Sequence, residues 1–371
     1  MIGIPSIAFT GGGSGGHIYP GLAIIEELRS HFRGRLVWIG STKDSDRKAV
    51  EAAGVEFFPI PSGKLRRQFS AENLADIFRV FAGYLAARKL LMQLAPALLF
   101  SKGGYVSVPP CRAAAGLGIP VFTHESDLSP GLATRLNAGV AETVFTAYAE
   151  TGAALPEAFQ PRVKQVGNPI RAAFASADAA RGRAFLGIPD GLPLVLALGG
   201  SQGSLQINQL VASCLPDILS RACLVHQTGT ANRAAAPEGL PCGERYRPMP
   251  YIGDELPDLL AAADIVVTRA GAGGLWEAGA LGKALILVPL AGAGTRGDQV
   301  DNARYFESRG AASVLAGAGA TPQRLSQLVL YWLDNPGEAA SAGAAARGIA
   351  HPGAAKSIAS SILERIGATT P

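Results

Sequence analysis

The chain has 371 residues, of which 48% are hydrophobic and 17% charged, and its formal net charge is +4. This length suits two domains with substantial cores, and the composition predicts a compact globular protein. Neither a run of about 18 uncharged apolar residues nor a signal peptide is present, so we expect neither a membrane-spanning helix nor export.

Strand-like apolar runs alternate with helical stretches along the chain. In the first half the predicted strands are residues 4–10, 35–40, 55–60, 97–102, 121–125 and 143–148, with 163–167 as a further candidate. The second half repeats the pattern at residues 192–198, 222–227, 246–252, 264–269, 284–288 and 312–315. This alternation is typical of parallel, doubly wound sheets, so the predicted fold class is α/β.

A break near the middle of the chain suggests the domain boundary. Gly167-Asn168-Pro169 ends the first series of strands, and proline disfavours a helical conformation at the residue before it. We expect a first Rossmann-like domain over residues 1–167 and a second over residues 168–352. Residues 353–371 contain a helical stretch from Ala354 to Ile366, which we expect to pack back on the first domain.

Two glycine-rich turns, residues 10–17 and 198–204, each follow an apolar run and open a helical stretch. Such turns hold phosphate on bare backbone N–H groups and a helix N-terminus. The first turn matches G-x-G-x-x-G, but the strand at 36–40 ends without the acidic residue of a dinucleotide site. Neither turn carries the Gly-Lys-Ser/Thr of a P-loop. The pair predicts two Rossmann-like domains with a ligand between them.

Two features bear on metal binding. Asp44-Ser45-Asp46 has the D-x-D pattern of some metal-dependent glycosyltransferases, but it lies at a predicted helix start, where acidic residues favour the helix dipole anyway. We favour the helix-start interpretation. The four cysteines (Cys111, Cys214, Cys223, Cys242) show no C-x-x-C spacing, which favours a reduced cytoplasm with neither disulfides nor zinc.

A basic and apolar segment extends over residues 64–91. Lys64-Leu65-Arg66-Arg67-Gln68-Phe69 leads into an amphipathic run with Leu74, Ile77, Phe78, Phe81, Tyr84 and Leu85, followed by Arg88-Lys89-Leu90-Leu91. A core helix with a solvated basic face fits this pattern. A surface whose bulky apolar groups enter lipid beside anionic headgroups fits it too. Residues 1–165 carry 17 Lys and Arg against 13 Asp and Glu, which slightly favours the anionic membrane surface.

Motifs along nearly the whole chain resemble those of the MurG family of peptidoglycan UDP-N-acetylglucosamine transferases. They are residues 12–20 (Gly-Gly-Ser-Gly-Gly-His-x-x-Pro), 101–105, 124–127, 167–171, 199–203, 269–272 with Glu277, and 296–299 with Asn302-Ala303. The resemblance implies a GT-B fold, in which two Rossmann-like domains face each other across a cleft. It also implies inversion at the anomeric carbon, no metal or other cofactor for the chemistry, and a peripheral place on the cytoplasmic face of the cell membrane.

The implied reaction moves GlcNAc from UDP-GlcNAc to the MurNAc 4-hydroxyl of undecaprenyl-pyrophosphoryl-MurNAc-pentapeptide (lipid I), forming lipid II. No nucleic acid is an expected partner. The implied donor contacts are Ser14, Gly15, Gly16, Asp127, Arg171, Ser201, Gln202, Gly203, Ile252, Ala272, Gly273, Gly274, Leu275, Trp276, Glu277 and Gln299. Among them Glu277 would accept the ribose hydroxyls, the Ile252 backbone would meet uracil, and Gln299 would read the GlcNAc hydroxyls. Ser201 could cap the helix and still face phosphate.

The acceptor and the proton acceptor are assigned to the first domain. Gly12, Gly13, Ser14, Gly15, Gly16, Gly103, Gly104 and Tyr105 would contact the lipid-linked pyrophosphate or line the cleft. An in-line displacement needs one base, and the candidates are His17 first, then His124 with Glu125. Asp127 and the turn Gly273-Gly274-Leu275-Trp276 depart from the family pattern, which bears on donor selectivity more than on the reaction.

Three alternatives remain beside the lipid I transferase. One is a related GT-B transferase with another acceptor, and another is a UDP-GlcNAc 2-epimerase, which shares the double Rossmann layout. The third is a non-catalytic nucleotide-sugar-binding partner of a cell-wall complex. That protein would keep Glu277 and the second glycine-rich turn but could dispense with His17, His124 and Glu125, so their presence favours catalysis.

Overall fold

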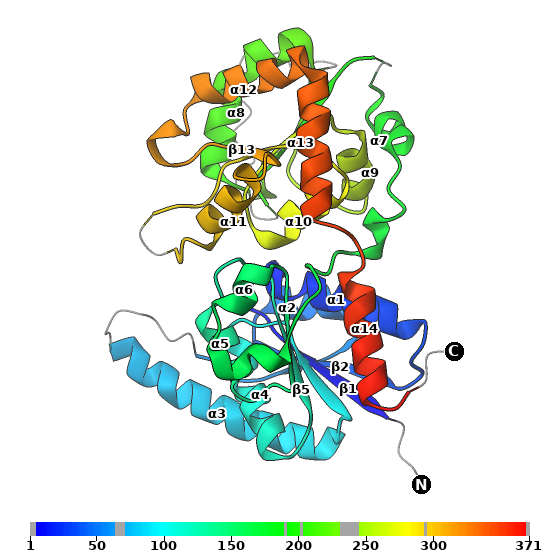
Figure 1. Ribbon diagram of the computed structural model, residues 1–371, viewed down its shortest axis with the longest axis vertical. Helices are drawn as coiled ribbons and strands as arrows, with labels where there is room; N and C mark the ends of the chain where they lie inside the picture. Colours follow the sequence, from blue (N-terminus) through cyan, green and yellow to red (C-terminus); the bar gives the residue numbers. More distant parts are fainter. Residues whose placement is uncertain are drawn as a thin grey trace. The chain divides into compact units, whose positions relative to one another are not determined.

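The computed structural model describes residues 5–63, 71–188, 191–200, 203–230, 245–292 and 295–368 (Figure 1). Two compact units make up the chain. The first unit consists of Met1–Arg171 together with Pro352–Pro371, and the second consists of Ala172–His351.

The first unit is built on a seven-stranded parallel sheet with the order β3-β2-β1-β4-β5-β6-β7. Its strands are β1 (Ser6–Thr10), β2 (Arg35–Gly40), β3 (Glu56–Pro59), β4 (Leu98–Ser101), β5 (Val121–Glu125), β6 (Thr143–Thr146) and β7 (Val163–Gln165). The α-helices are α1 (Tyr19–Arg29), α2 (Asp44–Ala52), α3 (Ala71–Leu94), α4 (Val108–Gly116), α5 (Leu132–Ala138), α6 (Ala149–Ala153) and α14 (Ala354–Arg365). Short 3-10 turns form at Gly15–His17, Tyr105–Ser107 and Glu157–Arg162.

The second unit is built on a six-stranded parallel sheet with the order β10-β9-β8-β11-β12-β13. Its strands are β8 (Leu194–Leu198), β9 (Cys223–Gln227), β10 (Tyr246–Met249), β11 (Ile265–Thr268), β12 (Ala284–Leu287) and β13 (Ala312–Val314). The α-helices are α7 (Ala179–Leu186), α8 (Leu205–Arg221), α9 (Leu256–Ala262), α10 (Ala272–Ala280), α11 (Asp298–Glu307), α12 (Pro322–Asp334) and α13 (Pro336–Ile349). Short 3-10 turns form at Ala172–Phe174 and Gly317–Gly319.

The strands confirm the predicted fold class of two Rossmann-like, doubly wound parallel sheets. Every residue of β1 and of β8 is buried, because helices cover both faces of such a sheet and the strands need apolar side chains on both sides. The observed strands lie within the predicted runs; β2 and β5 have the predicted bounds, and the others are shorter. β10, for example, ends at Met249, just before Pro250, and tolerates Pro248 because it is an edge strand.

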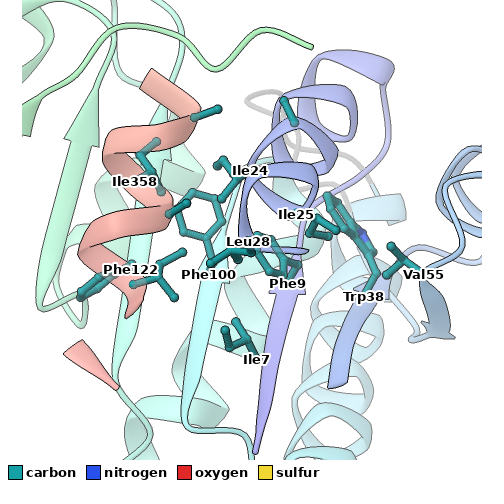
Figure 2. Close-up of a cluster of buried hydrophobic side chains, with 14 of the residues drawn as sticks. Ile7, Phe9, Ile24, Ile25, Leu28, Trp38, Val55, Phe100, Phe122 and Ile358 are labelled. Atoms are coloured by element: carbon teal, nitrogen blue, oxygen red, sulfur yellow. The ribbon is translucent and has the colours of Figure 1, made fainter. Parts of the chain in front are cut away.

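A cluster of buried aromatic and aliphatic side chains joins the C-terminal helix to the first unit. Phe9 of β1, Trp38 of β2 and Phe100 of β4 belong to this cluster together with Ile358 of α14 (Figure 2). An exposed ion pair at 2.7 Å between Arg365 Nε and a carboxylate oxygen of Glu142 lies at the end of the same helix. Burial of the apolar face of α14 therefore makes residues from the end of the chain part of the first unit.

Candidate functional site

The strand order of each sheet reverses at one place. In the first unit the chain moves outward in opposite directions from β1 and β4, and in the second unit from β8 and β11. Ligands of open α/β sheets bind at the carboxyl ends of the strands beside such a switch point. The two glycine-rich turns follow β1 and β8, so each of them lies at the switch point of its own sheet.

At the first switch point, the turn after β1 and the turn after β4 pack against each other. Gly13 has φ +89°, and a Cβ atom there would lie 2.7 Å from Cε1 of Tyr105. Gly104 has φ +76°, and its Cβ would lie 2.9 Å from Cδ2 of His17 and 2.8 Å from the carbonyl oxygen of Gly12. Only glycine permits this backbone conformation and this close approach without strain. The sequence-predicted acceptor residues thus come together in one place.

The Asp46 side chain is hydrogen-bonded to the backbone of the first glycine-rich turn. Its Oδ2 atom accepts hydrogen bonds from the backbone N–H of Gly13 at 2.7 Å and from the hydroxyl of Ser41 at 2.6 Å. The Asp46 side chain is buried, whereas Asp44 is exposed at the start of α2. The D-x-D pattern therefore serves the helix start and the turn. Among the described residues no three His, Cys, Asp or Glu side chains gather into a candidate metal site.

His17 ends a 3-10 turn that begins at Gly15, and its backbone N–H donates to the carbonyl oxygen of Ser14 at 3.1 Å. Ser14, Gly15 and Gly16 are exposed, and His17 is half-buried at the base of their turn. This exposed backbone beside an imidazole is an arrangement in which an anion and a proton acceptor can meet.

His124, the second candidate base, is fully buried in β5. Its Nε2 lies 2.9 Å from the carbonyl oxygen of Gly167, which can only accept, so Nε2 carries a proton. Burial, and then the charge of Lys102, lowers the pKa of His124 well below 6.5. Its Nδ1 atom is buried with no hydrogen-bond partner among the described residues. These features favour a neutral, positioning imidazole over a base in contact with substrate.

Glu125 is buried as well, and its carboxylate organises the turn after β5. Oε2 accepts from the N–H of Gly131 at 2.9 Å and from the hydroxyl of Thr134 at 2.5 Å, while Oε1 accepts from the N–H groups of Ser126 and Asp127. Burial raises the pKa of Glu125, but the hydrogen bonds from Thr134 and Gly131 and the charge of Lys102 bring it below its ordinary value. A carboxylate engaged in this way is a poor base.

In the second unit, α8 begins directly after the second glycine-rich turn. Ser204 is its N-cap, and the Ser204 hydroxyl accepts from the N–H of Ile207 at 3.3 Å and from Nη2 of Arg269 at 2.6 Å. Arg269 also donates to Gln206 and to the carbonyl oxygen of Val288. Arg269 therefore ties the ends of β11 and β12 to the start of α8. Ser201 and Gln202, two predicted donor contacts, lie outside the described residues.

Gln227, at the end of β9, links the second glycine-rich turn to the segment predicted to meet uracil. Its Nε2 donates to the carbonyl oxygen of Gly200 at 2.8 Å, and its Oε1 accepts from the N–H of Ile252 at 2.9 Å. Ile252 itself is buried, and Gly203 packs so tightly that a Cβ would lie 2.3 Å from the carbonyl oxygen of Thr228. Gln227 thereby holds the backbone at Gly200 close to the backbone at Ile252, although the two are far apart in sequence.

The first turns of α10 present bare backbone. A Cβ at Gly273 or Gly274 would have nothing within 4 Å, and Glu277 is half-buried on the same helix. The side chains of Leu275 and Trp276 point into the core, with Trp276 only 1% exposed. The indole of Trp276 therefore belongs to the core, and Leu275 and Trp276 could touch a ligand through their backbones only.

The remaining predicted donor contacts are distributed over both units. In the second unit, Gln299 accepts from the N–H of Leu290 at 2.9 Å, and its Nε2 lies 3.8 Å from the position of a Cβ on Gly271, just before α10 and Ala272. In the first unit, the guanidinium of Arg171 lies 5.7 Å from the ring centre of Tyr19 on α1. Asp127 is half-buried in the turn after β5.

Sequence reasoning assigned no supporting role to four residues that hold these turns: Asp46, Lys102, Gln227 and Arg269. Each is a polar side chain at or just after the end of a parallel strand or at the start of the following helix. For Lys102 the only sequence signal is its place directly after an apolar strand-like run; the structure shows that it is 1% exposed there and so needs polar partners, which the sequence does not name. The partners of the others come from distant parts of the chain.

Both halves of the chain match models of one known family. The Glycosyltransferase family 28 N-terminal domain matches residues 7–146, and the Glycosyltransferase family 28 C-terminal domain matches residues 194–362. A UDP-N-acetylglucosamine–N-acetylmuramyl-(pentapeptide) pyrophosphoryl-undecaprenol N-acetylglucosamine transferase of Treponema denticola is 45% identical over 339 residues, which cover 87% of each chain.

Solved structures share the architecture. The MurG structure from Acinetobacter baumannii has a TM-score of 0.73 and 23% identity, and the match covers 97% of this chain and 99% of that one. A UDP-GlcNAc 2-epimerase from Neisseria meningitidis bound to UDP-GlcNAc has a TM-score of 0.67 and 14% identity, covering 97% and 100%. Because transferase and epimerase both match at low identity, these structures show the fold alone.

Proposed function

The chain belongs to glycosyltransferase family 28, and we propose that it transfers GlcNAc from UDP-GlcNAc to the MurNAc 4-hydroxyl of lipid I, forming lipid II. The observation that carries the choice of substrates is the 45% identity to the Treponema denticola transferase over 87% of both chains. The epimerase alternative shares only the fold, at 14% identity. The chain is thus a glycosyltransferase that acts in peptidoglycan synthesis.

We assign the donor to the second unit. The bare backbone at Gly273 and Gly274 and the start of α8 after Ser204 can hold a diphosphate, which leaves with the negative charge that develops during transfer. Glu277 on α10 offers a carboxylate for the two ribose hydroxyls, and Gln299 offers an amide for the sugar. The Gln227 bridge holds the Ile252 segment beside the second glycine-rich turn for uracil.

We assign the lipid-linked acceptor and the general base to the first unit. Inversion in one in-line displacement needs a group that takes the proton of the attacking hydroxyl. Glu125 is buried with both carboxylate oxygens hydrogen-bonded, and His124 is fully buried with its Nε2 bonded to Gly167, whereas His17 lies half-buried beside the exposed Ser14–Gly16 backbone. We therefore assign the general base to His17 and the binding of the pyrophosphate to the turns around it. Gly103, Gly104 and Tyr105 pack against His17 and Gly13 and would support both.

We place the enzyme on the cytoplasmic face of the membrane, bound through α3. Ile77, Phe78, Phe81 and Leu85 on this helix are 50% to 68% exposed, and α3 packs on α4 at the outside of the first unit (Figure 1). Large exposed apolar side chains beside Arg79 and Lys89 suit an anionic lipid surface. The preceding basic residues 64–70 and the side chain of Leu74 lie outside the described part. No helix in the described part is long and apolar enough to span a membrane.

The histidine assignment can be tested with a matched pair of variants. His17→Ala should bind UDP with nearly unchanged affinity but slow GlcNAc transfer to a short-chain lipid I analogue by about 10²-fold or more, because a general base is lost. His31→Ala, which removes an exposed histidine beyond α1, should transfer at the normal rate. Normal turnover in His17→Ala would remove His17 from the mechanism.

A further inference from the structure

Lys102 is a fully buried cation that follows β4 and precedes the Gly103-Gly104 turn. The Lys102 side chain is 1% exposed, and its Nζ donates to the hydroxyl of Ser126 at 2.7 Å. Burial lowers the pKa of Lys102 to about 8, although the charges of Glu125 and Asp127 oppose this shift. A buried ammonium is costly unless it is paired, so its contacts have a structural or functional purpose.

The contact of Lys102 continues through Ser126 to residues 166–171, which follow β7 and end this part of the first unit. These residues are called the outgoing segment. The ammonium has no acceptor atom, so the Ser126 hydroxyl accepts from Lys102 and gives its own proton to Oδ1 of Asn168 in a short hydrogen bond. Asn168 is 1% exposed. The result is a directed series of hydrogen bonds from the end of β4, through the end of β5, to the segment after β7.

His124 makes a second contact with the same segment. Its Nε2 donates to the carbonyl oxygen of Gly167 at 2.9 Å, one residue before Asn168. In addition, the N–H groups of Val166 and Gly167 both donate to the carbonyl oxygen of Thr146, at 3.0 and 3.3 Å. Two neighbouring residues of this segment are thus held by side chains from the end of β5: Gly167 by His124, and Asn168 by Ser126, which follows β5 and is itself bonded by Lys102.

The turn that touches His17 begins at the next residue after Lys102. A Cβ at Gly103 would lie 3.7 Å from the carbonyl oxygen of His124 and 3.8 Å from Nδ1 of His17, and Gly104 packs directly on the His17 ring. Lys102 is therefore adjacent in the chain to the turn that packs on His17, and we expect a change in its position to reach that turn. The outgoing segment and the proposed base share one support.

We propose that Lys102, Ser126 and His124 are positioning residues that hold Gly167 and Asn168 in one conformation and couple this segment to the turn that supports His17. The inference rests on the proposed function for its effect on transfer, but the contact with the outgoing segment stands independently of it. None of the three residues needs to touch substrate in this role. They would act through the placement of His17 and of the chain as it leaves the first unit.

Ser126 offers the mildest test, because its backbone contact with Glu125 survives substitution. In Ser126→Ala, amide hydrogen exchange over residues 166–171 should become about ten-fold faster, as expected for the loss of a buried hydrogen bond to a charged group. The kcat of transfer should fall several-fold, and by a larger factor than the KM for UDP-GlcNAc rises, because the donor residues assigned to the second unit are untouched and only Asp127 and Arg171 lie in or beside the affected part of the first unit. Ser126→Thr, which keeps the hydroxyl, should restore both values towards those of the wild type.

Lys102→Met and Lys164→Met form the second pair, since Lys164 is an exposed lysine on β7 just before the same segment. Only Lys102→Met should make amide hydrogen exchange over residues 166–171 faster. Unchanged exchange in both Ser126→Ala and Lys102→Met would overturn the proposal, and so would faster exchange with unchanged kcat. A wild-type protein without transfer activity, but with looser exchange in Ser126→Ala, would refute the proposed function and leave the hydrogen-bonded support standing.

Discussion

Replacement of Asp46 by alanine should destabilise the first unit, although Asp46 belongs to a motif that elsewhere binds metal. One buried carboxylate oxygen accepts two hydrogen bonds, from the Gly13 N–H and the Ser41 hydroxyl. A hydrogen bond to a charged group contributes about 1.5–3 kcal/mol, and the variant leaves the Gly13 N–H unsatisfied. We therefore expect a loss of about 3 kcal/mol in the unfolding free energy.

The measurement is native-state hydrogen exchange of the buried β1 amides, which reports the unfolding free energy of the first unit alone. Asp44→Ala is the matched control, because Asp44 is the exposed acid at the start of the same helix and should contribute at most about 0.5 kcal/mol. Equal effects of the two substitutions, or effects that appear only when divalent metal is present, would refute a structural role for Asp46.

Three further predictions concern the donor, the membrane and pH. Glu277→Ala should weaken UDP binding about ten-fold or more and abolish the preference for UDP over 2′-deoxy-UDP in calorimetry, because a carboxylate partner of the ribose is lost; a retained preference would contradict the assignment. Phe78→Asp combined with Phe81→Asp should reduce sedimentation with anionic liposomes while leaving the circular dichroism spectrum normal, and undiminished binding would exclude α3 as the lipid contact. Burial lowers the pKa of His226 to about 4, so between pH 6.5 and 4 the unfolded chain takes up a proton that the folded second unit does not. Exchange of the β8 amides should show the second unit losing about 3 kcal/mol over this range in the wild type but little in His226→Gln.

The strands were predictable because buried parallel strands are continuous apolar runs, and the helices that alternate with them indicate parallel pairing; the order of the strands came from the structure. β1 and β8 are fully buried and stand out in the sequence for this reason. The C-terminal helix α14 was predicted as a helical stretch from Ala354 to Ile366, and its buried cluster with Ile358 explains why it packs on the first unit.

The supporting contacts of the site were not predictable, because each joins residues that are distant in sequence. Asp46 meets Gly13 across 33 positions, Lys102 meets Ser126 across 24, and Ser126 meets Asn168 across 42. Local patterns do not encode such pairs. The burial of the Trp276 indole was not predictable either, and it restricts the predicted donor contact at this position to the backbone.

The roles of His17, Glu277 and the other predicted site residues remain predictions until a substrate is followed. Burial of His124 and Glu125 narrows the choice of base by a physical argument, because a buried, hydrogen-bonded group exchanges protons with a substrate poorly. The geometry therefore ranks the three candidates in an order that the sequence alone suggested only weakly.

The most direct test of the central claim is transfer from radiolabelled UDP-GlcNAc to a synthetic short-chain lipid I analogue, with UDP release followed in parallel. We expect a labelled β-linked disaccharide on the lipid and one UDP released for each GlcNAc transferred, as an inverting displacement requires. Binding of UDP-GlcNAc without any disaccharide product, or conversion of the free nucleotide sugar to its 2-epimer, would contradict the proposed function.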